Sequence, residues 1–212
     1  RFIKNIKDMS MAGNLLVSLM SDVASVFSVP TEVVKYFFTK REEELKNIIS
    51  SEIRDGDFSY VDKDEIISII VRLLNDINEG VGKNNIRLMA RIIVGLNDKK
   101  ELTASKFHNF NTILANLSYE EIMFLADVIK EYKTGLPKEI YNKLDNPKEV
   151  AVLSKIVNQN KNGHILLSLL KTGFFEPFFM PTARIKYKIS PLFLEFMDLI
   201  QNWEDIANWK KE

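Results

Sequence analysis

Few residues in this chain could do chemistry, and they are widely separated. Only two histidines occur, His108 and His164, and there is no cysteine. Neither histidine has an acidic residue three or four positions away, where a helix would bring the two side chains together. A protein metal site needs three or four suitable ligands, so the sequence predicts no metal site. The absence of cysteine excludes disulfides, thiolate nucleophiles and iron–sulfur clusters.

Two further stretches look like ligand-binding loops but lack the required residues. The pair Gly80 and Gly82 has neither the third glycine nor the Lys-Ser/Thr of nucleotide-binding loops. The acidic run that begins at Asp55 places Tyr60 sixth and Ile66 twelfth, where a calcium loop needs glycine and glutamate. The chain also has no Gly-x-Ser-x-Gly nucleophile motif. We therefore expect a protein that is not an enzyme and binds no cofactor.

The composition is typical of a globular protein without a strong charge bias. The 212 residues include 29 Lys and Arg and 29 Asp and Glu, so the formal net charge is zero. This balance argues against strong binding of the whole chain to nucleic acid, although it allows a local basic face. Because a chain without cysteine needs no oxidising compartment, we predict a cytoplasmic location.

The first half of the chain predicts helices. The run Met9–Val29 has apolar residues at helical spacing and polar residues opposite, which predicts an amphipathic helix packed on a core. A helix lying on a membrane surface is the alternative, although the polar side carries few cations. Asp62, with Glu65 three residues later, has the spacing of a helix capping box. Lys63–Leu96 then shows the strongest helical pattern, and its paired glycines predict a break within it.

We expect a domain boundary in the turn-rich segment Gly95–Thr103. Residues 1–100 would form a helical domain and residues 101–212 a second domain. In the second domain, Ser118 and Glu121 again have capping-box spacing. Other helices are expected at Thr31–Phe38, Thr39–Arg54, Thr103–Asn116 and Pro137–Leu144, and between Pro147 and Thr172 with a polar interruption at residues 158–163.

A β-hairpin and a final helix are predicted near the C-terminal end. Phe174–Phe179 is predicted as a first strand, and Arg184–Ile189, which alternates basic with apolar residues, as a second. Met180–Ala183 would form the tip between them. A Ser-Pro step at Ser190 is typical of a helix start. The expected fold class is therefore mainly α, with a short hairpin in the second domain.

The helix, hairpin and final helix resemble the end of the winged-helix superfamily. The matching residues are Leu170-Lys171-Thr172-Gly173-Phe174-Phe175 and Tyr187-Lys188-Ile189-Ser190-Pro191. The resemblance runs from about Ser118 onward and implies a C-terminal winged-helix-like domain behind an N-terminal helical domain. The whole layout is also similar to bacterial helical proteins with a winged-helix end and no assigned activity, which implies a bacterial protein.

Aromatic residues make docking of a protein partner, or formation of a homodimer, the first expectation for function. Neighbouring residues in a strand point to opposite faces, so adjacent phenylalanines cannot both point inward from one strand. Some of these rings should therefore cover a second surface. The candidate interaction residues are Phe174, Phe175, Phe178, Phe179, Trp203 and Trp209.

DNA binding is the alternative, and the winged-helix resemblance implies it. The helix before Gly173 would then read base edges, and the basic side of the second strand would contact phosphates. That helix is poor in basic residues, so we rank a DNA-binding regulator second and a peripheral membrane protein third. The candidate nucleic-acid residues are Lys161, His164, Ser168, Lys171, Arg184, Lys186 and Lys188.

Overall fold

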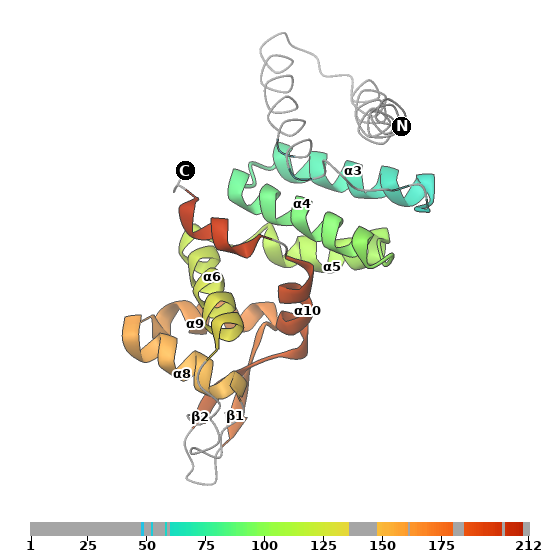
Figure 1. The fold of residues 1–212 in the computed structure, drawn as a ribbon. Coiled ribbons are helices and arrows are strands. Elements are labelled where there is room, and N and C mark those ends of the chain that lie inside the picture. The colour runs from blue at the N-terminus through green and yellow to red at the C-terminus, as the bar shows by residue number, and fades with distance from the viewer. Residues whose placement is uncertain are drawn as a thin grey trace. The chain divides into compact units, whose positions relative to one another are not determined.

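The fold is mainly helical with a small antiparallel hairpin near the C-terminal end, as the sequence predicts (Figure 1). It is seen in a computed structural model that describes residues 48, 52 and 58 and the ranges 60–135, 148–160, 162–179, 185–200 and 202–209. The chain divides into two compact units between Asn116 and Leu117. We call them the first and the second unit and describe each by itself.

The described part of the first unit contains the helices α3 (Lys63–Asn78), α4 (Lys83–Asp98) and α5 (Ala104–Leu114), with α5 packed against both others (Figure 1). The break that the paired glycines predict lies between α3 and α4. There Gly80 has a φ of +86°, a conformation that side chains with a Cβ rarely adopt. The helices bury a common apolar core of Ile66, Ile69, Ile70, Leu73, Leu88, Met89, Ile92, Phe107, Phe110 and Leu114.

The start of α3 differs in one respect from the predicted capping box. Asp62 caps the helix, because its carboxylate accepts a hydrogen bond of 2.8 Å from the Asp64 amide. Glu65 does not reach back to Asp62. Its carboxylate instead accepts a hydrogen bond from the amide of Ala104, the first residue of α5. That amide has no partner within its own helix, so Glu65 ties the start of α3 to the start of α5.

The boundary between the units lies later than the expected position at residue 100. Gly95 is buried inside α4, where the sequence suggests a loop, and the helix ends only at Asp98. One glycine costs a helix about 1 kcal/mol, which the burial of neighbouring Leu96 can offset. The next helix buries Phe107 and Phe110 in the unit formed with α3 and α4. It therefore belongs to the first unit.

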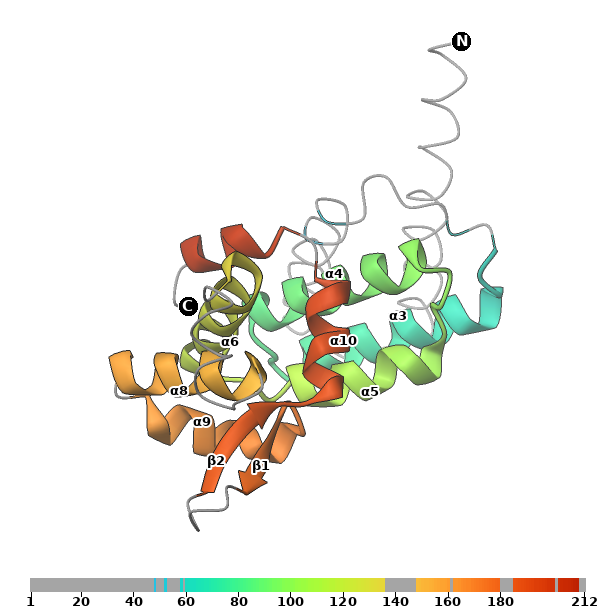
Figure 2. The same ribbon diagram turned by 60° about the horizontal axis from the view of Figure 1, so that its bottom comes forward.

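The second unit combines helices with the hairpin (Figure 2). Helix α6 packs against α8, α9 and the final 3₁₀ helix η2, and strand β2 packs against α8. The polar interruption predicted at residues 158–163 is shorter in the structure, because residues 158–160 continue α8 and Gly163 begins α9. Its described elements are α6 (Tyr119–Thr134), α8 (Lys148–Asn160), α9 (Gly163–Leu169), the 3₁₀ turn η1 (Leu170–Thr172), β1 (Phe175–Phe179), β2 (Ile185–Ile189), α10 (Pro191–Leu199) and η2 (Trp203–Asn208).

An aromatic cluster joins the root of the hairpin to α10. The ring of Phe174 lies 5.3 Å from that of Phe193 and 5.0 Å from that of Phe196, and Phe175 lies 5.3 Å from Phe193. Phe174 and Phe175 are both buried. The alternation rule does not apply to them, because β1 begins only at Phe175. The residue before them, Gly173, turns the chain with a φ of +74°.

Several predicted segments lie outside the described residues. They are Met9–Val29, Thr31–Phe38, most of Thr39–Arg54, most of the acidic run from Asp55, Pro137–Leu144 and the hairpin tip Met180–Ala183.

The aromatic cluster predicts a large difference between two phenylalanine substitutions in the second unit. Phe193→Ala removes a fully buried ring, so we expect a loss of about 3–5 kcal/mol in the free energy of unfolding. Phe179→Ala, which removes a ring that is 73% exposed, should change it by less than about 0.5 kcal/mol. Urea unfolding followed by the fluorescence of Trp203 and Trp209 measures both. Equal losses would contradict the burial of Phe193 and the exposure of Phe179.

Candidate functional site

One face of the hairpin changes from buried to exposed along its length. Directly opposed residues of an antiparallel pair share a face. At the root, Phe175 faces Ile189 and both are buried, whereas at the outer end Phe179 faces Ile185. The exposed fractions there are 73% for Phe179 and 60% for Ile185. We call these two residues the hairpin-end pair.

The opposite face of the hairpin carries the basic residues. Lys188 lies opposite Glu176 in the strand register, and its ammonium group is 3.0 Å from the Glu176 carboxylate. This ion pair offsets the charge of Lys188. Lys186 lies opposite Phe178, and both side chains are half-buried. The predicted basic face is therefore present on β2, but one of its two described cations is paired.

The helix before the hairpin presents a mixed surface. His164, Leu167, Ser168 and Lys171 are exposed, and Leu167 has an exposed fraction of 56%. An exposed leucine suits an apolar partner better than a base edge. Of the remaining nucleic-acid candidates, Lys161 and Arg184 lie outside the described residues.

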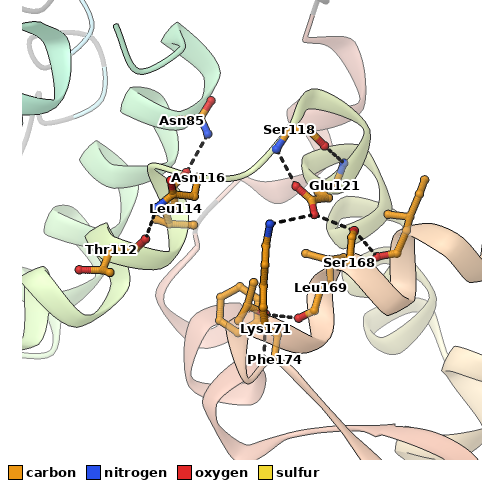
Figure 3. A network of polar contacts seen from close by, with 12 residues as sticks. Asn85, Thr112, Leu114, Asn116, Ser118, Glu121, Ser168, Leu169, Lys171 and Phe174 are labelled. Atoms are coloured by element: carbon orange, nitrogen blue, oxygen red, sulfur yellow. Dashed lines mark hydrogen bonds and ion pairs between the residues drawn. The ribbon is translucent and has the colours of Figure 1, made fainter. Parts of the chain in front are cut away.

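Two of these side chains turn toward a carboxylate of α6 (Figure 3). The Ser168 hydroxyl lies 2.7 Å from a carboxylate oxygen of Glu121 and 2.8 Å from the Ile165 carbonyl. Its single proton can be donated to only one of them at a time. The Lys171 ammonium lies 3.9 Å from the same Glu121 oxygen. Ser168 and Lys171 thus serve in part to hold α9 and η1 against α6.

Glu121 is itself held by the predicted capping box. Its carboxylate accepts a hydrogen bond of 2.7 Å from the Ser118 amide, and its own amide donates to the Ser118 hydroxyl at 3.2 Å. Burial raises the pKa of Glu121. The hydrogen bonds from Ser118 and Ser168, together with the charge of Lys171, outweigh burial and place its pKa below the ordinary value.

The two tryptophans lie against α6 within the same unit. η2 packs on this helix, and the Tyr119 hydroxyl donates a hydrogen bond of 2.9 Å to the Trp209 carbonyl. Trp209 is buried and Trp203 is half-buried, with the Lys133 ammonium 5.8 Å from the Trp203 ring centroid. Of the six aromatic interaction candidates, only Phe179 is mainly exposed.

The first unit contains a polar cluster that the sequence analysis missed. Asp76 on α3 has an exposed fraction of 0%, and the Arg72 guanidinium lies 3.3 Å from it on the same helix. Asn111 on α5 is also fully buried, and His108 adds an imidazole from the same helix. Sequence spacing held a clue. Asp76 lies three residues after Leu73, and Asn111 four after Phe107, at positions where each helix otherwise buries apolar side chains.

Burial is the main influence on Asp76 and raises its pKa above the ordinary value. The nearby Asn111, Arg72 and His108 oppose this rise, and Glu79 adds to it.

Within the described ranges, no group of three or more His, Asp or Glu residues is arranged to hold a metal ion. Nor does any described helix have the length and apolar character needed to cross a membrane.

The chain matches no protein-family model, no curated protein and no solved structure.

The network around Glu121 predicts a pH-dependent loss of stability. Because its folded-state pKa is lowered, the ionised carboxylate stabilises the fold above the unfolded-state pKa, near 4.5. That contribution disappears as the pH falls through the folded-state pKa. Glu121→Gln should therefore lower the free energy of unfolding at pH 7 by about 1.5–3 kcal/mol, the range for hydrogen bonds to charged groups. The difference from the parent protein should shrink below about pH 4.5.

The matched control is Glu120→Gln, which changes an exposed neighbour in the same helical turn. Glu120 experiences a similar helix dipole. Its substitution should change the free energy of unfolding by less than about 0.5 kcal/mol. Urea titrations at several pH values, followed by tryptophan fluorescence, compare the two. A pH-independent loss for Glu121→Gln would show that its charge plays no part.

Proposed function

We propose that this chain is a non-enzymatic protein-interaction module whose hairpin docks a protein partner. The hairpin-end pair, Phe179 and Ile185, would insert into an apolar pocket of that partner. The observation that carries this proposal is the exposure of the two side chains on one face of the hairpin. Buried aromatic anchors surrounded by weaker contacts dominate the energy of many protein interfaces.

The size of the exposed pair favours an anchor over a complete dimer interface. Together, the two side chains expose roughly 300 Å², whereas a stable interface buries about 800 Å² on each partner. At about 25 cal/mol per Å², burying this area would contribute roughly 7 kcal/mol. Association costs about 4–15 kcal/mol in lost freedom. The pair would therefore need a pocket that surrounds it and further contacts at its rim.

The hairpin favours docking through side chains over the addition of a strand. Pro177 lies in the middle of β1 and has no amide hydrogen to offer a neighbouring strand. Prolines occur within strands mainly where their nitrogen faces an open edge. A peptide that added to the β1 edge would lose a hydrogen bond at this position, so the exposed side chains are the better contact surface.

DNA binding by a winged-helix-like domain is the second candidate. The order of α9, β1, β2 and α10 is compatible with the resemblance seen in the sequence, and Lys186 has a place on the hairpin from which it could reach phosphate. Three observations favour the protein partner instead. Leu167 is exposed on the helix that would read bases, Lys188 is paired with Glu176, and the chain carries no net charge. A membrane-surface role rests on Met9–Val29, outside the described residues.

Site-specific crosslinking tests the protein-docking proposal. A photoreactive phenylalanine analogue at position 179 should give an adduct of one defined mass in extracts of the source cells. Adding Ile185→Ser should abolish that adduct, because it removes half of the exposed pair. The matched control is Leu167→Ser, which removes a similarly exposed aliphatic side chain from α9 and should leave the adduct intact. Loss of the adduct with Leu167→Ser but not with Ile185→Ser would move the contact surface to α9.

Light scattering across protein concentrations, with and without random duplex DNA, separates the other candidates. A constant monomer mass that DNA does not change is expected. A mass increase with DNA that disappears at moderate salt would reveal phosphate contacts and overturn the proposal in favour of DNA binding. A concentration-dependent dimer that Phe179→Ser dissociates would identify the partner as a second copy of the chain.

A further inference from the structure

The polar cluster between α3 and α5 has fewer hydrogen-bond donors than acceptors. No hydrogen bond of normal length and angle reaches either oxygen of Asp76, either polar atom of the Asn111 carboxamide or Nε2 of His108, and all five atoms are buried. The Asn111 carboxamide is nevertheless close enough to act on the Asp76 carboxylate as a weak hydrogen-bond donor, which lowers the pKa of Asp76. The Arg72 guanidinium is close enough for an ion pair at 3.3 Å but does not form a hydrogen bond with the carboxylate. More than nine in ten buried polar groups in proteins are hydrogen-bonded, so this concentration on two packed helices is unusual.

One added proton would bring the number of hydrogen-bond donors in this cluster closer to the number of acceptors. The two oxygens of an ionised Asp76 and the oxygen of Asn111 can only accept, the Asn111 nitrogen can only donate, and His108 Nε2 can do either according to its tautomer. A protonated Asp76 becomes a hydroxyl donor. It could then donate to the Asn111 oxygen or to His108 Nε2 while its carbonyl oxygen accepts from the Asn111 amide.

We propose that Asp76, Asn111 and His108 form a proton-binding site in which one bound proton, carried by Asp76, holds α3 against α5. These two helices pack against each other in the first unit (Figure 2). When the proton leaves, a charged carboxylate remains inside the interface, and the weak contact with the Asn111 amide satisfies it only in part. An unsatisfied buried group of this kind costs about 1–3 kcal/mol, and more when it is charged. Local opening that lets water reach the carboxylate then becomes easier.

The surrounding charges fix the direction of the pH dependence. Burial and the carboxylate of Glu79 favour the protonated form, whereas Arg72 and the imidazole of His108 favour the ionised form. Lys106, the other charged side chain of α5, is paired with Glu101 at 2.6 Å. The pKa of Asp76 is raised above 3.8 in the folded state. The stabilisation is therefore complete below the unfolded-state pKa and is lost as the pH rises through the folded-state pKa.

Amide hydrogen exchange in the full chain tests the proposal, because it reports on α3 and α5 directly, whereas both tryptophans lie in the second unit. Asp76→Asn keeps the shape of the carboxyl group and cannot ionise. Protection factors of the α3 and α5 amides, corrected for intrinsic exchange, would be measured between pH 4.5 and 8. The ratio of protection in Asp76→Asn to that in the parent should rise with pH, by at most tenfold per pH unit, and then level off. A ratio that does not change with pH would overturn the proposal.

Two further measurements distinguish ionisation of Asp76 from a general effect of removing a negative charge. Asp98→Asn, which removes an exposed carboxylate at the end of α4, should give a ratio to the parent that is constant with pH. In the parent protein, the carboxyl ¹³C signal of Asp76 should titrate at a higher pH than those of exposed aspartates. Titration at or below pH 3.8 would overturn the proposal even if Asp76→Asn failed to fold.

Discussion

The aromatic packing at the root of the hairpin determines where the rest of the second unit can make contacts. Phe174 and Phe175 are fixed against Phe193 and Phe196 of α10. A strand rises about 3.3 Å per residue, so Phe179 lies roughly 13 Å further along β1 than Phe175. Since the core encloses the root, the outer end of the hairpin necessarily projects from it. Phe179 and Ile185 are thus exposed because the aromatic core encloses the root of the hairpin and not its outer end.

Two buried carboxylates show that burial alone does not decide the charge of a group. Burial raises the pKa of both Glu121 and Asp76. Glu121 lies at a helix start, where the Ser118 amide has no other partner, and it also receives the Ser168 hydroxyl. Asp76 lies inside α3, where the backbone amides are already bonded to one another, and it depends on an ion pair with Arg72 and a weak contact with the Asn111 carboxamide. Burial acts on both carboxyl groups in the same direction. The stronger hydrogen bonds at Glu121 lower its pKa overall, whereas the weaker contacts at Asp76 leave its pKa raised.

Local rules predicted much of the fold but little of its tertiary contacts. The glycine break after α3, the Ser118 capping box and the start of α10 at Ser190 each depend on neighbouring residues, and the structure confirms them. The hydrogen bond from Ala104 to Glu65 and the position of Asp76 beside Asn111 depend on residues more than thirty positions apart. Periodicity could have marked Asp76 as a polar residue in an apolar stripe. It could not have named the helix that faces it.

An exposed phenylalanine and isoleucine at the end of a hairpin create a risk of aggregation, and neighbouring residues of the two strands reduce that risk. Apolar patches on strands promote aggregation, which proteins counter with proline and lysine on open strands. Both are present here: Pro177 removes an amide from the middle of β1, and Lys186 and Lys188 alternate with the apolar residues of β2. These residues hinder pairing of strand edges but leave the apolar face itself uncovered. Serine or threonine at position 179 would remove the hazard without disturbing the buried root, so the packing of the second unit does not itself require the ring that the proposed docking contact would use.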